Sequence, residues 1–266
     1  MKLLFLGTGA AGSMRRNESE MVAGKRRCAS MMIDENVLVD IARQSFDHAT
    51  KLGCDTSAVT DIFLSHAHGD HFCRETLLQY AAVAKNKLRF WCHRGAVAHL
   101  GLSEEDMELV DICPVDVLDT WETAGMTVTA LPANHISGDL DSPEQPLHYL
   151  FEKNGKKMYY GCDGGWYTAV EWEYLRKHKV VLDAVIMDAT VGEDAGNFRI
   201  ATHNNLAMLE IMVLALRQNE ILSENALLIA DHIHDPLYSA PDHEGQAETF
   251  ARLGMVMADE GKSFEI

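Results

Sequence analysis

The sequence has no C-x-x-C pair. Its six cysteines stand apart, at positions 28, 54, 73, 92, 113 and 162. This spacing argues against a disulfide framework and against a zinc site built from cysteine. We interpret most of the six as small, buried side chains.

Long apolar runs and basic residues are also scarce. No apolar run approaches the length that crosses a membrane. The apolar N-terminus turns at Gly7 after a few residues and has no small-residue cleavage site, so we expect a buried strand and a cytoplasmic protein. With 23 basic and 40 acidic residues, the net charge is −17. Such a surface repels nucleic acid, which we therefore do not expect as a partner.

One short stretch is rich in metal-ligating groups: His66-Ala67-His68-Gly69-Asp70-His71. It follows an apolar segment, 60–65, with the composition of a strand. Imidazole and carboxylate are ordinary ligands of zinc and neighbouring metals. Four such side chains exceed the need of one open tetrahedral site and suit two adjacent ions. The alternative is a polar loop that happens to be rich in histidine.

The apolar pattern predicts many short strands with helices between them. We expect strands over 2–6, 28–33, 37–41, 88–92, 110–117, 126–131, 147–152, 157–161, 183–187, 226–230, 255–258 and 263–266. We expect helices over 46–52, 74–84, 95–100, 167–178, 206–218 and 244–253. The helix over 206–218 is apolar on nearly all sides and should be buried. Two successive β-rich halves suggest one domain, 1–266, with two sheets face to face and helices outside.

Further candidate ligands stand where other apolar strands end. They are His135, Asp163, His203 and His232. His234 competes with His232, because the two side chains would point the same way on an extended segment. Asp40 ends a strand and is either an ordinary polar residue or a group that orients a ligating histidine. We assign no functional role to His48, His93, His99, His148, His178 and His243.

A basic loop stands out in this acidic chain. It spans 13–27 and holds Arg15, Arg16, Lys25, Arg26 and Arg27. Such a charge run is often only a solvated loop. The functional alternative is a clamp for a phosphate group of the substrate, with the four arginines as its donors.

Along nearly its whole length the sequence resembles the metallo-β-lactamase superfamily, an α/β (α+β) fold built as a four-layer αβ/βα sandwich. The H-x-H-x-D-H motif carries the resemblance. It implies that His66, His68 and His135 hold one ion, that Asp70, His71 and His232 hold the other, and that Asp163 bridges them. Asp70 would thereby also belong to the catalytic centre.

Within the superfamily the chain is most similar to the phosphodiesterase branch, which includes ribonuclease Z and a cyclic-phosphate phosphodiesterase. The Leu6-Gly7-Thr8-Gly9 opening, the segment from Asp188 to His203, and Asp231-His232 carry this similarity. Two departures matter. The long tRNA-binding arm of ribonuclease Z has no counterpart, and the basic loop replaces a cysteine cluster that some cyclic-phosphate enzymes carry.

These residues predict a phosphodiesterase with two Zn²⁺ or Mn²⁺ ions that acts on a small cyclic or nucleotide phosphodiester. Two ions about 3.5–4 Å apart would ionise a bridging water and clamp the phosphate oxygens. His203, a non-ligand, would donate a hydrogen bond or a proton. The alternatives are a tRNA 3′-processing endoribonuclease, a lactone or thioester hydrolase, and a non-catalytic metal-binding protein. A homodimer is compatible with the sequence, which does not fix the oligomeric state.

Overall fold

The computed structural model describes residues 1–11, 26–240 and 242–266, and these residues form two seven-stranded sheets. The first sheet has the order β14 (Ser263–Glu265), β1 (Lys2–Gly7), β2 (Ser30–Ile33), β3 (Val37–Val39), β4 (Asp61–Phe63), β5 (Leu88–His93) and β6 (Val110–Val115). The second has the order β13 (Val256–Met257), β12 (Leu222–Asp231), β11 (Leu182–Asp188), β10 (Lys156–Gly161), β9 (Leu147–Lys153), β8 (Met126–Pro132) and β7 (Thr120–Thr123).

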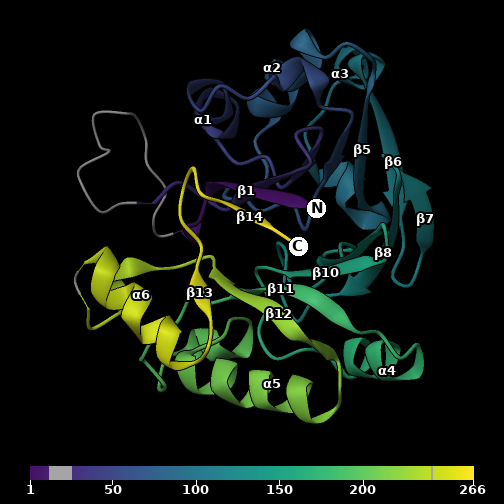
Figure 1. Ribbon diagram of the computed structural model, residues 1–266. Coiled ribbons are helices and arrows are strands. Elements are labelled where there is room, and N and C mark those ends of the chain that lie inside the picture. Colours follow the sequence, from purple (N-terminus) through teal and green to yellow (C-terminus); the bar gives the residue numbers. More distant parts are fainter. Residues whose placement is uncertain (12–25, 241) are drawn as a thin grey trace.

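The helices cover the outer faces of the two sheets (Figure 1). Those of the first half are α1 (Ser45–Lys51), α2 (Arg74–Val83) and α3 (Glu104–Leu109), and those of the second are α4 (Ala169–Lys177), α5 (Leu206–Gln218) and α6 (His243–Arg252). Short 3₁₀ turns η3 (Thr56–Ala58), η4 (Arg94–His99), η5 (Phe198–Ala201) and η6 (Asp235–Leu237) connect them. None of the helices in the described ranges is long and apolar enough to span a bilayer.

Side-chain alternation along the strands produces the layers. On β10, Tyr160 points into the core between the sheets, and its neighbour Tyr159 packs in the core under the helices of the second half. On β2, Met31 faces the inter-sheet core and Met32 the core under the helices of the first half. Because successive side chains of a strand point to opposite faces, three apolar cores separate four layers. The predicted sandwich of two sheets with outer helices is confirmed.

Most predicted elements are present, with some differences. The helix predicted over 95–100 is the 3₁₀ turn η4. The strand predicted over 226–230 is part of the longer β12, while α3 and β7 were not predicted at all. The helix over 206–218 forms, and the prediction that it is buried holds for one face only, which carries Leu209, Met212, Val213 and Leu216. Ile211 and Leu214 of α5 are each 54% exposed, because the helix lies outside the second sheet and only one face packs on it.

Two long-range contacts fix β1 in the first sheet, one at each end of the strand. A Cβ on Gly7 would lie 1.9 Å from the carbonyl oxygen of Cys28, so only glycine fits where β1 ends. The return strand β14 pairs antiparallel with β1, with Lys2 opposite Glu265. The last strand therefore belongs to the sheet of the first half, although α6 and β13 before it pack on the second.

Candidate metal centre

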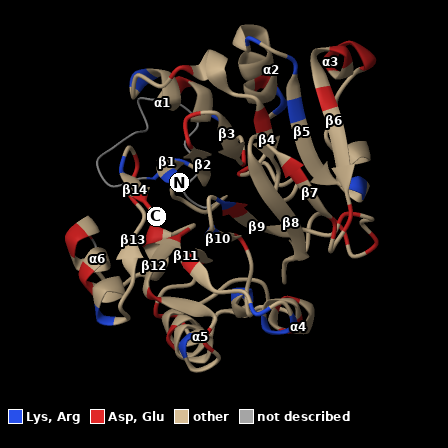
Figure 2. Ribbon diagram, turned by 45° about the vertical axis from the view of Figure 1, so that its right-hand side comes forward, with Lys and Arg blue, Asp and Glu red and all other residues tan. Residues whose placement is uncertain are grey.

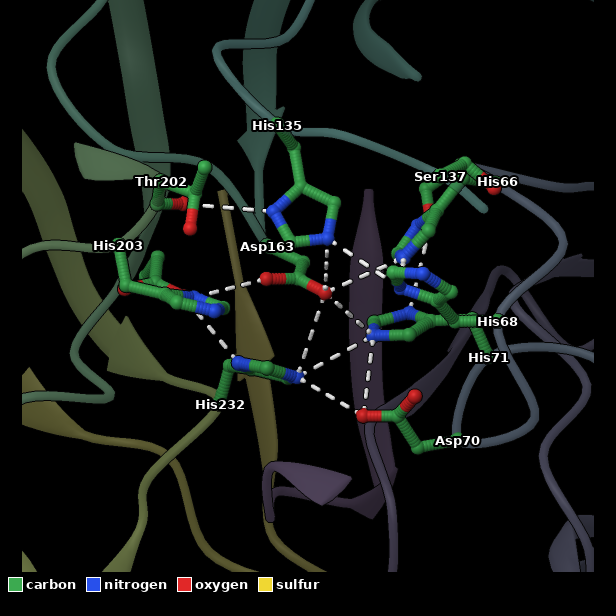
Figure 3. Close-up of polar contacts among 12 residues, drawn as sticks. His66, His68, Asp70, His71, His135, Ser137, Asp163, Thr202, His203 and His232 are labelled. Atoms are coloured by element: carbon green, nitrogen blue, oxygen red, sulfur yellow. Dashed lines mark hydrogen bonds and ion pairs between the residues drawn. The ribbon is translucent and has the colours of Figure 1, made fainter. Parts of the chain in front are cut away.

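The carboxyl ends of several strands meet at one edge of the sandwich. In the second sheet β10, β11 and β12 are mutually parallel, and β8 runs the same way because β9 is antiparallel to both β8 and β10. His135, Asp163 and His232 follow β8, β10 and β12, and so reach the same edge. The loop after β4 brings the H-x-H-x-D-H residues to them from the first sheet (Figure 3).

Three groups of candidate ligands share Asp163: Asp163, Asp188, His203 and His232 form one, and the other two contain the H-x-H-x-D-H residues. Of these two, one is His66, His68, His135 and Asp163, and the other is Asp70, His71, Asp163 and His232. Within each group the candidate ligand atoms lie within 4.8 Å of one another. The two groups with H-x-H-x-D-H residues are the sets that the superfamily resemblance implies, with the same shared carboxylate.

The spacing of the donor atoms suits bound ions. Oδ2 of Asp163 lies 3.3 Å from Nε2 of His66, 3.1 Å from that of His71, 3.5 Å from that of His135 and 3.7 Å from that of His232. Four ligands placed tetrahedrally about 2.0–2.1 Å from zinc are about 3.3 Å apart. Nε2 of His71 also faces Nε2 of His232 at 3.1 Å. Two buried imidazole nitrogens that face one another at this distance are placed as ligands of one cation between them.

The charges around the centre keep Asp163 ionised and His135 neutral, whereas burial is outweighed at His71 and His232, where nearby carboxylates raise the pKa well above 6.5 and to about 9, respectively. Burial alone would raise the pKa of Asp163, but the positive charges of His232, His135 and His203 hold it well below 3.8. Burial lowers the pKa of His135 to about 4. A metal ion binds an ionised carboxylate and a neutral imidazole, so Asp163 and His135 fit the role.

Three residues at this edge have a left-handed backbone. The φ angles are 59° for Asp40, 56° for Asp163 and 57° for His232. Non-glycine residues adopt this conformation rarely, and such strain collects at functional sites. Each of these residues follows the end of a strand, and its left-handed backbone turns the side chain toward the other residues at that edge of the sandwich.

Asp40 supports the H-x-H-x-D-H loop from behind. Nδ1 of His71 donates to Oδ2 of Asp40 at 2.8 Å, and the backbone N–H of Ser65 donates to Oδ1 at 2.8 Å. The hydroxyl of Tyr160 is a third donor, at 3.2 Å from Oδ2. The carboxylate therefore leaves Nε2 of His71 free for the centre. Of the two interpretations of Asp40, this geometry matches the one in which it orients a histidine.

Sequence reasoning missed a second supporting carboxylate, Asp188. Its Oδ2 lies 3.0 Å from Nδ1 of His203 and 3.1 Å from Nδ1 of His232, and it accepts from the hydroxyl of Thr190 at 2.8 Å. Nδ1 of His203 also lies 2.9 Å from Oδ1 of Asp163. Burial alone would lower the pKa of His203, but Asp188 and Asp163 raise it to about 10. The signals for Asp188 were its position at the end of β11 and its place in the segment that resembles the phosphodiesterase branch, but neither predicted this supporting role.

Glu144 is a further supporting carboxylate that the sequence did not predict. It accepts from the backbone N–H of Ala67 at 2.9 Å and from the hydroxyl of Ser137. Through these bonds it joins the H-x-H turn to the loop that carries His135. No sequence pattern marks it, because the partner in the H-x-H turn, Ala67, lies 77 positions away in the chain.

Only His232 of the two competing histidines reaches the centre. Because the backbone at His232 is left-handed, the segment is not extended there, and the expected alternation with His234 does not hold. His234 belongs to none of the groups of four. Of the histidines without an assigned role, His148 is buried and lies 2.7 Å from Glu171.

The arginines of the basic loop that the structure describes are committed to other protein groups. Arg26 is buried and donates to Asp235, Thr8 and Gln246 at 3.0, 3.0 and 2.9 Å. Arg27 pairs with Glu260. A phosphate clamp formed by Arg26 and Arg27 is therefore not supported. Arg15, Arg16 and Lys25 lie outside the described residues.

The sequence matches the family model described as a β-lactamase superfamily domain over residues 36–229. The chain belongs to the β-lactamase superfamily. Its fold is the metallo-β-lactamase fold, and the protein is thus a metal-dependent hydrolase of that superfamily. Comparison of the sequence with curated proteins finds no match.

Several solved structures share the fold of this superfamily member over nearly all of its length. Zn²⁺-bound PqqB from Methylobacterium extorquens has a TM-score of 0.74 at 16% identity, with 100% of each chain covered. A diphosphatase of the PhnP family has a TM-score of 0.71 at 19% identity, with 100% of this chain and 97% of that one covered. Human tRNase Z, short form, has a TM-score of 0.69 at 16% identity, covering 100% and 99%. At such low identity these likenesses show the fold alone.

Proposed function

We propose that the protein is a phosphodiesterase that uses two divalent ions, Zn²⁺ or Mn²⁺, and acts on a small phosphodiester. One observation carries the proposal. Two groups of four candidate ligands contain the H-x-H-x-D-H residues and share Asp163. A further histidine, His203, belongs to neither of these two groups, but its Nδ1 lies against the shared carboxylate. When bound, two ions would lower the pKa of a water molecule between them and neutralise charge on the phosphoryl oxygens.

The residues around the ions have two roles, metal binding and proton donation. Asp163 would hold both ions, with His66, His68 and His135 on one side and Asp70, His71 and His232 on the other. His203 is held by Asp163 and Asp188 through Nδ1, and its Nε2 makes no hydrogen bond with any other described residue. With its pKa raised to about 10, the imidazole is protonated near neutral pH. It is therefore poised to donate from Nε2 to a phosphoryl oxygen or to a leaving oxygen.

The charge of the protein favours a small substrate over tRNA. In Figure 2 the ribbon is coloured for Asp and Glu on helices and loops of both halves, with α3 and α6 among them. Nucleic-acid binding depends on neutralising backbone phosphates with Lys and Arg, and an overall charge of −17 opposes it. The similarity of fold to tRNase Z does not alter this argument, because it concerns the scaffold only.

A panel of three esters tests the proposal. Bis-p-nitrophenyl phosphate, a lactone and a thioester are each offered to the protein loaded with Zn²⁺ or Mn²⁺, with and without a chelator. We expect hydrolysis of the phosphodiester, and its loss on chelation. Hydrolysis of the lactone or thioester alone would assign the centre to carbon-centred chemistry. Absence of any turnover by protein with two ions per chain would contradict the proposal.

A further inference from the structure

The turn that leads into His203 presents two unusual side chains beside the centre. In η5 (Phe198–Ala201), the backbone carbonyl of Arg199 accepts from the N–H groups of Thr202 and His203 at 2.9 and 2.8 Å. Asn197 caps the turn by accepting from the N–H of Arg199 at 3.0 Å. These bonds fix Phe198 and Arg199 relative to the imidazole that contacts Asp163.

Phe198 is apolar and almost fully exposed. Among the large apolar side chains of the described residues, Leu140 at 94% and Phe198 at 86% are the two most exposed, and the next reach only 54%. Both belong to loops of the centre: Leu140 follows His135, and Phe198 precedes His203. Figure 3 shows the two loops meeting where Nδ1 of His135 faces the carbonyl oxygen of Thr202, at 3.4 Å. An exposed apolar side chain on a loop that borders a polar centre is typical of a ligand-binding surface.

Arg199 supplies an uncommitted positive charge at the same place. Within the described ranges its guanidinium forms no hydrogen bond or ion pair, in contrast to Arg26 and Arg27, which are bonded to carboxylates. Beside it, Nδ1 of His234 is enclosed and lacks a hydrogen-bond partner among the described groups. Burial and the charge of Arg199 both lower the pKa of His234. In a chain with an excess of carboxylates, an arginine that pairs with none of the described residues is available to an anion.

We propose that Phe198 and Arg199 bind the part of the substrate that lies beyond the scissile phosphate, and that this part carries a planar ring and a second negative charge, as a nucleotide does. The inference rests on the proposed phosphodiesterase activity and names its substrate class. Phe198 would stack on the ring, as aromatic side chains do on the bases of nucleic acids. Arg199 would bind the second anion with its planar, two-pronged donor set.

Three phosphodiesters with the same p-nitrophenol leaving group separate these two contributions. They are methyl p-nitrophenyl phosphate, thymidine 5′-(p-nitrophenyl phosphate), and the same nucleoside ester with a 3′-phosphate. We expect Phe198→Ala to lower kcat/KM for both nucleoside esters about tenfold more than for the methyl ester. We expect Arg199→Gln to lower kcat/KM about tenfold more for the 3′-phosphorylated ester than for the unphosphorylated one. Phe198→Trp and Arg199→Lys should recover part of each loss.

Two variants on the outer face of α5 serve as matched controls. Ile211→Ala and Arg217→Gln remove an exposed apolar side chain and an exposed cation from another surface, and they should leave the ratios among the three esters unchanged. Equal losses for all three esters in the Phe198 and Arg199 variants, or no loss, would overturn the inference. So would a dimer that Phe198→Ala dissociates in sedimentation without changing those ratios, because the exposed side chain would then serve self-association.

A binding measurement separates this inference from the proposed reaction. Thymidine 3′,5′-bisphosphate is titrated into the metal-loaded protein by calorimetry. We expect Phe198→Ala and Arg199→Gln each to weaken binding about tenfold. If the protein hydrolyses none of the phosphodiesters but binds the bisphosphate with these losses, the recognition site stands and the proposed reaction fails. If the wild type does not bind the bisphosphate, the recognition site is wrong.

Discussion

A single carboxylate oxygen lies at the middle of the candidate centre. Oδ2 of Asp163 faces four imidazoles, and Oδ1 faces a fifth, that of His203. Its backbone is left-handed, at φ 56°. The surrounding structure therefore stabilises a conformation that an isolated chain would rarely adopt, which makes the direction of this side chain a property of the fold.

We expect Asp163→Asn to bind fewer than two ions per chain and to lose at least about 10²-fold in phosphodiester turnover. Asparagine tolerates the left-handed conformation, so the loss reflects the missing charge and not backbone strain. Elemental analysis of the purified variant measures the ions. Asp139→Ala, an exposed acid on the loop after His135, is the control and should keep both. Two ions per chain in Asp163→Asn would show that this carboxylate does not bridge them.

His203 is expected to matter for the reaction and not for metal binding. We expect His203→Ala to retain both ions while its kcat falls by about 10²–10⁴-fold, because a positioned proton donor contributes that much. His99→Ala, which alters an exposed histidine on η4, should behave as the wild type. Full turnover with normal metal content in His203→Ala would exclude the role as donor.

At the scale of elements, one buried acid ties the two sheets together. Asp61 on β4 accepts from Arg89 and Trp91 on β5, at 2.6–2.8 Å. It also accepts from Thr123 on β7, the edge strand of the second sheet, at 2.6 Å. Burial alone would raise the pKa of Asp61, but the bonds from Arg89, Thr123 and Trp91 outweigh it and lower the pKa below 3.8.

We expect Asp61→Asn to reduce the free energy of unfolding by about 1–2 kcal/mol at neutral pH, because the bonds from the half-exposed Arg89 and from Trp91 and Thr123 lose their charged, buried acceptor. Since the folded pKa lies below the unfolded one, this stabilisation is complete above pH 3.8 and is lost as the pH falls through the folded pKa. Urea unfolding of both proteins with chelator, from pH 7 to pH 3, measures the gap. Asp111→Asn, in an exposed pair with Lys87, should change stability by less than about 0.5 kcal/mol. A gap that widens on acidification would contradict the assignment.

The elements also show how far the sequence determined this fold and centre. Strands and helices with a clear apolar period were predicted, and the strand ends pointed to His135, Asp163 and His232. The apolar pattern did not locate β7, which is largely polar, or α3, which has only six residues, although Ser103 and its acidic first turn are a helix-start signal. Nor could it distinguish a substrate clamp from a structural arginine. Arg26 donates to Asp235, which is 209 positions away in the chain.

At the scale of the whole molecule, the centre joins the two halves of the chain. His66, His68, Asp70 and His71 come from the loop after β4, and His135, Asp163 and His232 from the ends of strands in the second sheet. The periodicity of the sequence predicted two sheets but not which edges would meet. That depends on the direction of each strand and on the return of β14 to the first sheet, both of which are set by long-range pairing.

Because each ion would be bound by side chains from both sheets, metal should stabilise the folded protein as a whole. An ion that binds only the folded state stabilises it by about 2.7 kcal/mol at a concentration 100 times its Kd, so the unfolding midpoint should rise with added Zn²⁺ or Mn²⁺ and fall with chelator. His232→Ala should lose much of this response, whereas His234→Ala should keep it, since only His232 lies within a group of four. Denaturant unfolding at several metal concentrations measures the response. If His234→Ala lost the response and His232→Ala kept it, the last ligand would be His234. If neither wild type nor variants responded to metal, no ion would join the two sheets.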